Sequence, residues 1–468
     1  MNYLTFELWT GAKVADLPCP DRLEAPQQGY KPVCISDFCM KPPRNQSPLG
    51  LLFVLVLILL AVCARSASGL GIDLPDHDAF ATARGNAFAA TADDPAAVYY
   101  NPAGISQLEG VNFSMGAYGL AYGDHYKSGG VKIDSRTEWA ATPDIFTTIA
   151  LPKYHLTFGL GTYAPYGLVE EWPSSAPFAG VGRRGEIDYY TLNTVVAYQP
   201  ISSLSLAIGP TFNYSEADLR QSVPANSLGF GSPAFQTRFR GRDEDVGYTA
   251  GILWHPLPEH SFGISYRSAT DMKYTGHADF PSLPSPPFPT LLSLGGGVPA
   301  AADFKFPQSV DFGYSFRPTK AWNLEADAEW LDWETLNTLV LNGTSAPKGS
   351  PPLEKIPFDW RSSWVLKFGG TRYFGDGWRA SAGYMYVENS VPSGTFNPLI
   401  PDSDRHVFSV GIGKRYHKLS WDAAYQLAWG PSRSVTGDTL GVVPGPSPAN
   451  GKYEFLSHAF TFNVGYHF

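Results

Sequence analysis

The sequence predicts an all-β membrane protein: a 14-stranded antiparallel transmembrane β-barrel with a small, partly helical N-terminal hatch plugging the lumen. First, Gly (47), Tyr (25) and Phe (29) are abundant while charged residues make up 16%, against about 25% in soluble domains. Second, apolar residues alternate with polar or small ones over about ten positions at a time. Third, tight turns alternate with long loops. A soluble β-sandwich shows the same alternation of residues, so strand length, aromatic strand ends and the alternating connections favour the barrel.

An apolar targeting segment precedes the predicted barrel. Residues 49–62 carry no charge, follow basic residues and precede small ones, and the run is too short to span a bilayer comfortably. We therefore expect a signal peptide over residues 40–68, with cleavage near Ser68, and a non-native or disordered extension over residues 1–39. The alternative of a lipoprotein with Cys63 as its lipid acceptor is disfavoured by the bulky residue before that cysteine.

Cysteine usage and net charge exclude several classes of function. All four cysteines precede residue 64, which rules out a disulfide framework, a thiolate metal site and a catalytic cysteine in the main body. The net charge of -9 argues against nucleic acid as a partner, since polyphosphate binding needs a concentrated basic surface. The sequence contains no GxSxG, HExxH or P-loop motif, and its ten histidines are scattered. We expect no enzyme activity, no metal and no cofactor.

The hatch is predicted from the segment ADDPAAVYYNPAGISQLEG, residues 92–110. Asn101 can cap a short helix and Pro102 suits its first turn, and two apolar residues then give that turn one apolar side. Asn-Pro is also common in ordinary turns, so its position before a run of amphipathic strands carries the argument. We expect the hatch over residues 69–111 and the barrel over residues 112–468.

Fourteen amphipathic segments follow the hatch, and the last of them, residues 454–468, alternates most regularly. An even number of strands places both chain ends on the periplasmic side and the long loops outside. The longest predicted loops cover residues 216–245 and 271–305. The predicted strands lie near residues 112–122, 133–150, 155–166, 187–199, 203–215, 246–256, 260–270, 306–317, 321–333, 360–374, 377–388, 405–416, 418–430 and 454–468.

The third predicted strand contains Gly159, Gly161, Pro165 and Gly167. Proline cannot donate to a sheet ladder and glycine tolerates bulges, so we expect an interrupted wall between residues 159 and 167. In most strands such residues mark a structural irregularity without a function.

A loop rich in proline, glycine and serine carries large apolar side chains that suit the capture of a hydrophobic molecule. The alternative, that the loop folds onto its own apolar residues, is equally compatible with the sequence. These candidate capture residues are Phe280, Leu283, Phe288, Leu291 and Leu292.

Three acidic residues, Glu325, Asp327 and Glu329, share one face of a predicted strand and should point into the lumen. Paired carboxylates can catalyse hydrolysis, but rows of charge balanced by residues such as Arg379 are ordinary in barrel interiors. We assign no catalysis to them.

The segment DDPAAVYYNPAGISQLEG, residues 93–110, resembles the N-terminal hatch signature of the FadL/TodX family of outer-membrane transporters for hydrophobic compounds, including long-chain fatty acids. The resemblance extends over residues 69–468 and rests on several motifs in the family's order. The further matching segments are TFGLGTYAPYGL (157–168), SYRSATDMKYTG (265–276), NLEADAEWLDWETL (323–336) and IPDSDRH (400–406).

The resemblance implies a bacterial outer-membrane protein that takes up long-chain fatty acids or aromatic or aliphatic hydrocarbons passively. It implies capture by the extracellular loops, rearrangement of a hatch whose motif here is Asn101, Pro102 and Ala103, and lateral release into the membrane at the kinked third strand. The expected partners are a hydrophobic small molecule and outer-membrane lipid, and we expect a monomer. Two alternatives stay open at this point: an outer-membrane lipid-modifying enzyme and a general porin.

Asp402 and Arg405 match a further segment of that family, before the twelfth strand. A salt bridge in the lumen is favoured over the anchoring of a substrate carboxylate. A carboxylate ligand would predict a cationic residue deep in the lumen, whereas a toluene-like ligand needs none.

Overall fold

The computed structural model describes residues 72–223, 235–280, 296–440 and 446–468. The expected extension, the expected signal peptide and four of the candidate capture residues, Leu283, Phe288, Leu291 and Leu292, lie outside the described residues. Within the described ranges, no helix is both long and apolar enough to cross a membrane.

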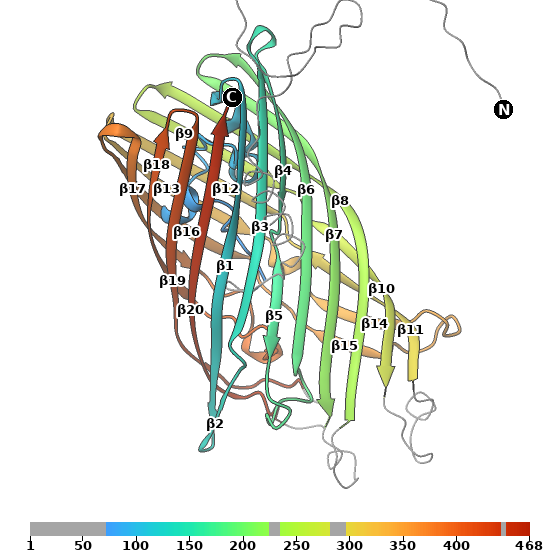
Figure 1. Cartoon of the computed structure of the whole chain (residues 1–468). Helices are drawn as coiled ribbons and strands as arrows, with labels where there is room; N and C mark the ends of the chain where they lie inside the picture. The colour runs from blue at the N-terminus through green and yellow to red at the C-terminus, as the bar shows by residue number, and fades with distance from the viewer. Residues whose placement is uncertain (1–71, 224–234, 281–295, 441–445) are drawn as a thin grey trace, which may run out of the picture. The chain divides into compact units, whose positions relative to one another are not determined.

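The strands form a closed ring, as Figure 1 shows. Antiparallel ladders join β1, β3, β4, β6, β7, β8, β9, β12, β13, β16, β17, β18, β19 and β20 in this order, and β20 pairs back onto β1. The predicted 14-stranded antiparallel barrel is therefore confirmed. The strands are β1 (Val111–Ser128), β2 (Val131–Asp134), β3 (Glu138–Leu151), β4 (Leu156–Tyr163), β5 (Gly167–Glu171), β6 (Arg184–Ile201), β7 (Leu204–Val223), β8 (Phe235–Leu257), β9 (His260–Arg267), β10 (Thr270–Phe280), β11 (Gly296–Phe306), β12 (Ser309–Thr319), β13 (Trp322–Leu331), β14 (Thr338–Gly343), β15 (Glu354–Pro357), β16 (Ser363–Tyr373), β17 (Trp378–Val387), β18 (Arg405–Tyr416), β19 (Leu419–Val435) and β20 (Gly451–His467).

The short helical elements lie in the hatch and in the connections. They are α2 (Ala79–Ala83), α3 (Ala97–Tyr100) and the 3-10 turns η1 (Pro102–Gln107), η2 (Pro152–Tyr154), η4 (Trp333–Thr335), η5 (Gly375–Gly377) and η6 (Ser393–Thr395). In Figure 1 the hatch lies inside the ring, toward the end that carries the C-terminus. We call this end, with its short turns, the turn end, and the opposite end the loop end.

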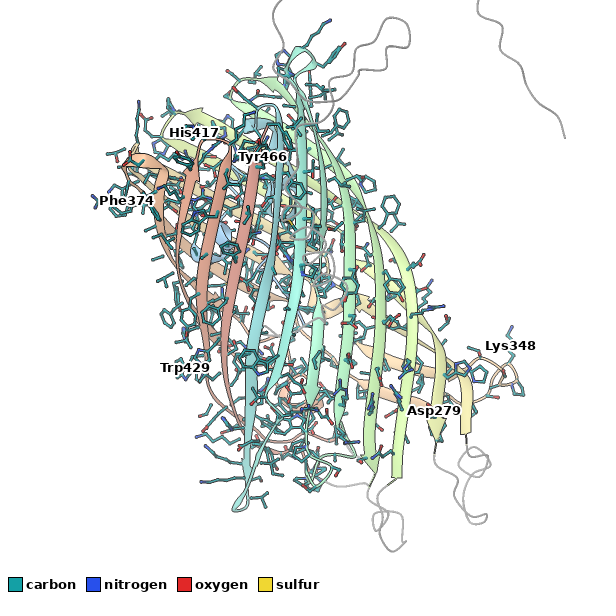
Figure 2. All side chains as sticks on the ribbon, in the orientation of Figure 1. Asp279, Lys348, Phe374, His417, Trp429 and Tyr466 are labelled. Carbon is teal, nitrogen blue, oxygen red and sulfur yellow. The ribbon has the colours of Figure 1, made fainter. Side chains whose placement is uncertain are left out.

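The outer face of the ring is apolar and the inner face is polar, the reverse of a soluble barrel. On β20 the outward side chains of Phe460 and Phe462 are 64% and 53% exposed, whereas the inward Thr461 and Asn463 are 2% and 3% exposed. Figure 2 shows Trp429 pointing away from the ring in the same manner. An apolar outer face on a closed ring of strands suits a bilayer, because apolar side chains are stable in contact with the hydrocarbon chains of lipid and not with water.

The longest predicted loops are mostly strand, which corrects their assignment. β7 continues to Val223 and β8 begins at Phe235, so most of residues 216–245 belongs to these two strands. β10 and β11 likewise occupy both ends of residues 271–305 and pair with each other. The predicted strands had about the length that crosses a bilayer, whereas β7 and β8 are longer. Strands can continue beyond the bilayer where their outward side chains are polar.

The hatch contains two capped helical turns. Asp78 caps α2, since its Oδ1 accepts the N–H groups of Phe80 and Ala81 at 2.8 and 3.0 Å. Asn101 caps η1 by accepting the N–H of Ala103 at 3.1 Å, and proline occupies the first turn. The predicted capping role of Asn101 is confirmed.

A buried ion pair anchors the hatch to the wall. Nη2 of Arg84 lies 2.8 Å from Oε2 of Glu325, and both side chains are fully buried. The other oxygen of Glu325 accepts the N–H of Ala90 at 2.7 Å, and Asp327 accepts the N–H of Phe88 at 2.8 Å. Because these carboxylates bind the hatch, they do not form a catalytic pair.

The predicted charge balance of the acidic row was wrong in one respect. Arg379 does not pair with this row; its Nη2 lies 2.6 Å from Asp422 on β19. Glu329 and Asp311 share Lys367, whose Nζ lies 2.7 Å from each carboxylate. Sequence spacing gave no signal for these partners, because they come from different strands.

Glycines in the wall let the hatch backbone lie directly against the barrel. A Cβ atom at Gly383 would lie 2.1 Å from the carbonyl carbon of Arg84, and one at Gly263 would lie 2.0 Å from the carbonyl oxygen of Ala89. Real Cβ atoms do not approach other atoms this closely. The abundance of glycine therefore has a packing reason at these two positions.

Replacing Arg84 with alanine should loosen the hatch while leaving the ring closed. Glu325 would keep its charge in a buried site without its cation, which costs about 3–5 kcal/mol. Hydrogen exchange of the amides of Phe88 and Ala90 should accelerate accordingly. The control is Arg317→Ala, because the pair of Arg317 with Asp93 is partly exposed and worth at most about 1 kcal/mol. Equal protection in both variants would contradict the anchoring role.

Candidate functional site: an apolar cavity beside an interrupted wall

The wall is interrupted in the third strand of the ring. β4 ends at Tyr163 and β5 begins at Gly167. β5 keeps its ladder to β6, but residues 138–144 of β3 are paired only with β1. At the loop end the interruption closes again, where the N–H of Arg136 donates to the carbonyl of Glu171 at 2.9 Å. The result is a window between β3 and β5.

The start of the hatch occupies the free edge of β5. In this N-terminal segment, residues 72–74, the carbonyl of Ile72 accepts the N–H of Gly167 at 2.9 Å. The N–H of Leu74 donates to the carbonyl of Pro165, also at 2.9 Å, and Asp73 and Tyr166 form an isolated antiparallel bridge. The segment therefore pairs with residues 165–167, in the break and at the start of β5, beside the stretch that β3 leaves unpaired.

The four residues predicted for the interruption have different positions. Pro165 lies in the break and Gly167 opens β5, whereas Gly159 and Gly161 lie inside the regular part of β4. Cβ atoms at these two glycines would lie 2.7 and 3.0 Å from the methyl groups of Val98 in the hatch. Gly159 and Gly161 thus make room for the hatch, and the break itself follows them.

An apolar cavity, the outer cavity, lies toward the loop end. It shares Leu168 with β5. Phe280, the one capture residue that the structure describes, lines it at the end of β10. Its apolar lining also includes Ile187, Ala217, Phe239, Ala302, Phe304, Leu339, Ile356 and Leu399.

Tyr166 connects the window to the interior. Its ring centroid lies 5.1 Å from that of Tyr189 and 4.7 Å from that of Phe306, and its hydroxyl donates to the carbonyl of Pro307 at 3.2 Å. The ring of Trp333 lies 6.2 Å away. Since Trp333 lines a second cavity together with Ile72 and Asp73, this aromatic cluster contacts the linings of both cavities.

A third cavity has a largely polar lining, which includes Arg267. The guanidinium of Arg267 lies 4.2 Å from the ring centroid of Tyr99. Among the described residues no carboxylate lies within 4.0 Å of this guanidinium, and its Nε has no hydrogen-bond partner. The lumen therefore contains a buried cationic side chain, Arg267, whose guanidinium faces the ring of Tyr99.

The remaining predicted residues lie in and around the hatch. The side-chain amide of Asn101 donates to the carbonyls of Ala89 and Ile252, at 2.7 and 3.0 Å, and so ties η1 to β8. Asp402 and Arg405 form an ion pair of 3.1 Å, with both side chains less than 10% exposed. Asp402 lines the second cavity.

The hatch segment that pairs with Tyr166 carries a titratable group, the Asp73 carboxylate. Burial, together with the charge of Glu329, raises the pKa of Asp73 to about 7, while Arg267 and Lys367 act in the opposite direction. Asp73 is therefore partly protonated near neutral pH, and the hatch segment at the window carries a variable charge.

Sequence reasoning missed Asp73, Tyr166 and Arg267. Tyr166 had a local signal, because it is an aromatic residue between Pro165 and Gly167. Asp73 and Arg267 had none, since their roles depend on contacts between distant segments. In the part of the chain that the structure describes, no group of three or more His, Cys, Asp or Glu side chains could hold a metal ion.

Comparisons with known proteins agree with this architecture. Residues 60–468 match the family described as outer membrane protein transport protein (OMPP1/FadL/TodX). The long-chain fatty acid transport protein of Escherichia coli O6:H1 is 22% identical over 446 residues, covering 88% of this chain and 97% of that protein. That of Salmonella typhi is 24% identical over 444 residues, covering 88% and 96%.

Two solved structures have the same fold. A Pseudomonas aeruginosa FadL homologue superposes with a TM-score of 0.72 at 19% identity, covering 85% of this chain and 99% of that chain. The Pseudomonas putida toluene transporter TodX gives 0.64 at 15% identity, covering 86% and 100%. With a match that spans the hatch and the whole ring, the chain belongs to the OMPP1/FadL/TodX family of outer-membrane transport proteins.

Proposed function

We propose that this protein takes up hydrophobic compounds across the outer membrane, from the outer cavity through the window between β3 and β5 and into the bilayer. The observation that carries the proposal is the window itself, where the N-terminal segment of the hatch pairs with residues 165–167 at the start of β5. The loop end then faces the cell exterior. The names of the relatives indicate long-chain fatty acids or aromatic hydrocarbons as the class of compound.

A lateral route suits an apolar cargo for a physical reason. An apolar molecule that leaves its binding site through a water-filled pore must expose its surface to water, which is unfavourable. A route that leads from apolar side chains directly into lipid avoids this exposure throughout. The outer cavity, the ring of Tyr166 and the window lie in sequence along such a route. Phe280 at the mouth of the cavity extends the apolar surface toward the loops.

Opening the window requires release of the N-terminal segment. Two backbone hydrogen bonds, to Pro165 in the break and to Gly167 at the start of β5, would break at a net cost of about 0.5–1.5 kcal/mol each, and the buried Ile72 and Leu74 would move. The Arg84 anchor lies farther along the hatch and would remain in place. A ligand that binds the open arrangement more tightly than the closed one can supply such a difference.

A disulfide between positions 73 and 166 should block uptake reversibly. Asp73 and Tyr166 form a non-hydrogen-bonded antiparallel pair, where Cα atoms lie about 4.5 Å apart and a disulfide fits. The native cysteines all precede residue 64, so Asp73→Cys/Tyr166→Cys would introduce the only thiols of the barrel. Uptake of labelled oleate and toluene by cells should stop on oxidation and resume on reduction.

The matched control for this disulfide is Met115→Cys/Ile145→Cys. These residues are partners in the β1–β3 ladder, so their disulfide would join two strands of the wall without touching the window. It should leave uptake unchanged. Normal uptake by the oxidised 73–166 variant would rule out the lateral route.

The closed window should be more stable at acid pH. The pKa of Asp73 is about 7 in the closed arrangement and about 3.9 when the segment is released. Between about pH 4 and pH 7 Asp73 is therefore protonated in the closed form and ionised in the open form. The stability of the closed form should fall as pH rises from about 4 to about 7. Hydrogen exchange at Gly167, corrected for the intrinsic pH effect, should reveal this. Asp73→Asn should abolish the dependence and Asp93→Asn should retain it; an unchanged profile in Asp73→Asn contradicts the assignment.

A further inference from the structure

Among the described residues that line the outer cavity, Glu354 is the one carboxylate. Glu354 begins β15, and the Nε2 of Gln221 on β7 donates to its Oε1 at 2.7 Å. Gln221 is itself directed into the cavity, since it follows the buried positions of β7 and lines the same space. The contact therefore joins β7 to β15 at the cavity wall, with a neutral amide as the partner of the carboxylate.

The two arginines that also line this cavity are engaged on the other side of the wall. Arg220 lies 2.9 Å from Asp218, and Arg238 binds the same carboxylate through a contact of 2.8 Å from its Nε. Asp218 alternates with the inward positions 217 and 219 of β7, so these ion pairs lie on the outward face of the strand, where the arginine side chains are 32% and 31% exposed and that of Asp218 is 14% exposed. Their guanidinium groups bind Asp218 and not Glu354.

Glu354 has no cationic partner. No Lys, Arg or His nitrogen lies within 4.0 Å of its carboxylate among the described residues. The three internal segments outside the described residues, 224–234, 281–295 and 441–445, contain no Lys, Arg or His at all. No cation from these segments is therefore available to neutralise Glu354.

We propose that Glu354 is a charge filter: in the outer cavity it discriminates against hydrophobic molecules that carry an ionised carboxylate and favours neutral ones. This inference rests on the proposed uptake of hydrophobic compounds and names their class. Two like charges in an apolar cavity repel strongly because the surroundings screen them weakly. A neutral hydrocarbon meets no such penalty, and an alcohol can donate a hydrogen bond to the second oxygen of Glu354.

The deeper cavities do not reverse this preference. Lys367 is bound by both Asp311 and Glu329. Arg267 faces the ring of Tyr99, and Asp73 and Glu329 lie within its electrostatic reach. An anionic head group would therefore meet acids as well as bases along the route, whereas a neutral molecule is indifferent to both.

The test compares 1-decanol with decanoate, which share a chain length and differ in charge. Equilibrium binding to the purified full-length protein in nanodiscs at pH 8 should favour decanol by about tenfold or more. Glu354→Gln should strengthen decanoate binding by about the same factor and leave decanol binding nearly unchanged. Gln221→Lys, which places a cation beside Glu354, should act in the same direction and provides a second variant if the first does not fold.

The control is Glu244→Gln, which removes a carboxylate from the exposed outward face of β8 and should leave both affinities unchanged. Equal affinity of the wild type for the two ligands, or an unchanged ratio in both cavity variants, would overturn the charge filter. These outcomes differ from failure of the proposed function, in which neither compound would bind or be taken up. If both bind and enter equally, uptake stands and the filter alone is wrong.

Discussion

Backbone hydrogen bonding is the constraint on which this structure depends. In lipid every peptide group needs a partner within the protein, and a closed ring of ladders supplies nearly all of them. β5 is the exception, because its edge toward β3 has no strand beside it. Residues 72–74 supply a partner where β5 begins, through hydrogen bonds with Pro165 and Gly167. The same hydrogen bonds thus close the wall and position the N-terminal segment of the hatch. Breaking them can open the wall laterally while the ladders of the ring stay intact.

Two parts of the hatch are bound to the barrel by different interactions. Around Arg84, a buried ion pair and several N–H groups are bound by Glu325 and Asp327, so displacement would leave charges unpaired in the interior. Residues 72–74 are held by two backbone hydrogen bonds, to Pro165 and Gly167, each worth about 0.5–1.5 kcal/mol. A strongly held body with a weakly held end can open a window repeatedly without losing the plug that closes the pore.

The ring could be predicted well from the sequence, because the pattern that specifies each strand lies within that strand. Alternation along each strand determines which face meets lipid, and Asn101 followed by Pro102 determines where the helical turn begins. The site was less accessible, because its contacts join distant segments: Arg84 and Glu325 are separated by 241 residues, and Gln221 and Glu354 by 133. Gly159 and Gly161 show the same limit, since a glycine that makes room for Val98 cannot be distinguished in sequence from one that marks a bulge.

Fold alone cannot select the cargo in this family. A chain named for long-chain fatty acids and a chain named for toluene both match this protein over most of their length. The selecting features must therefore lie in side chains that line the route. Apolar lining residues accept either kind of chain, so discrimination falls to the few charged groups and to whether each has a partner. Arg220 and Arg238 are held outside by Asp218, whereas Glu354 is held only by an amide. One buried carboxylate without a cation is then sufficient to make the outer cavity sensitive to the charge of what enters it.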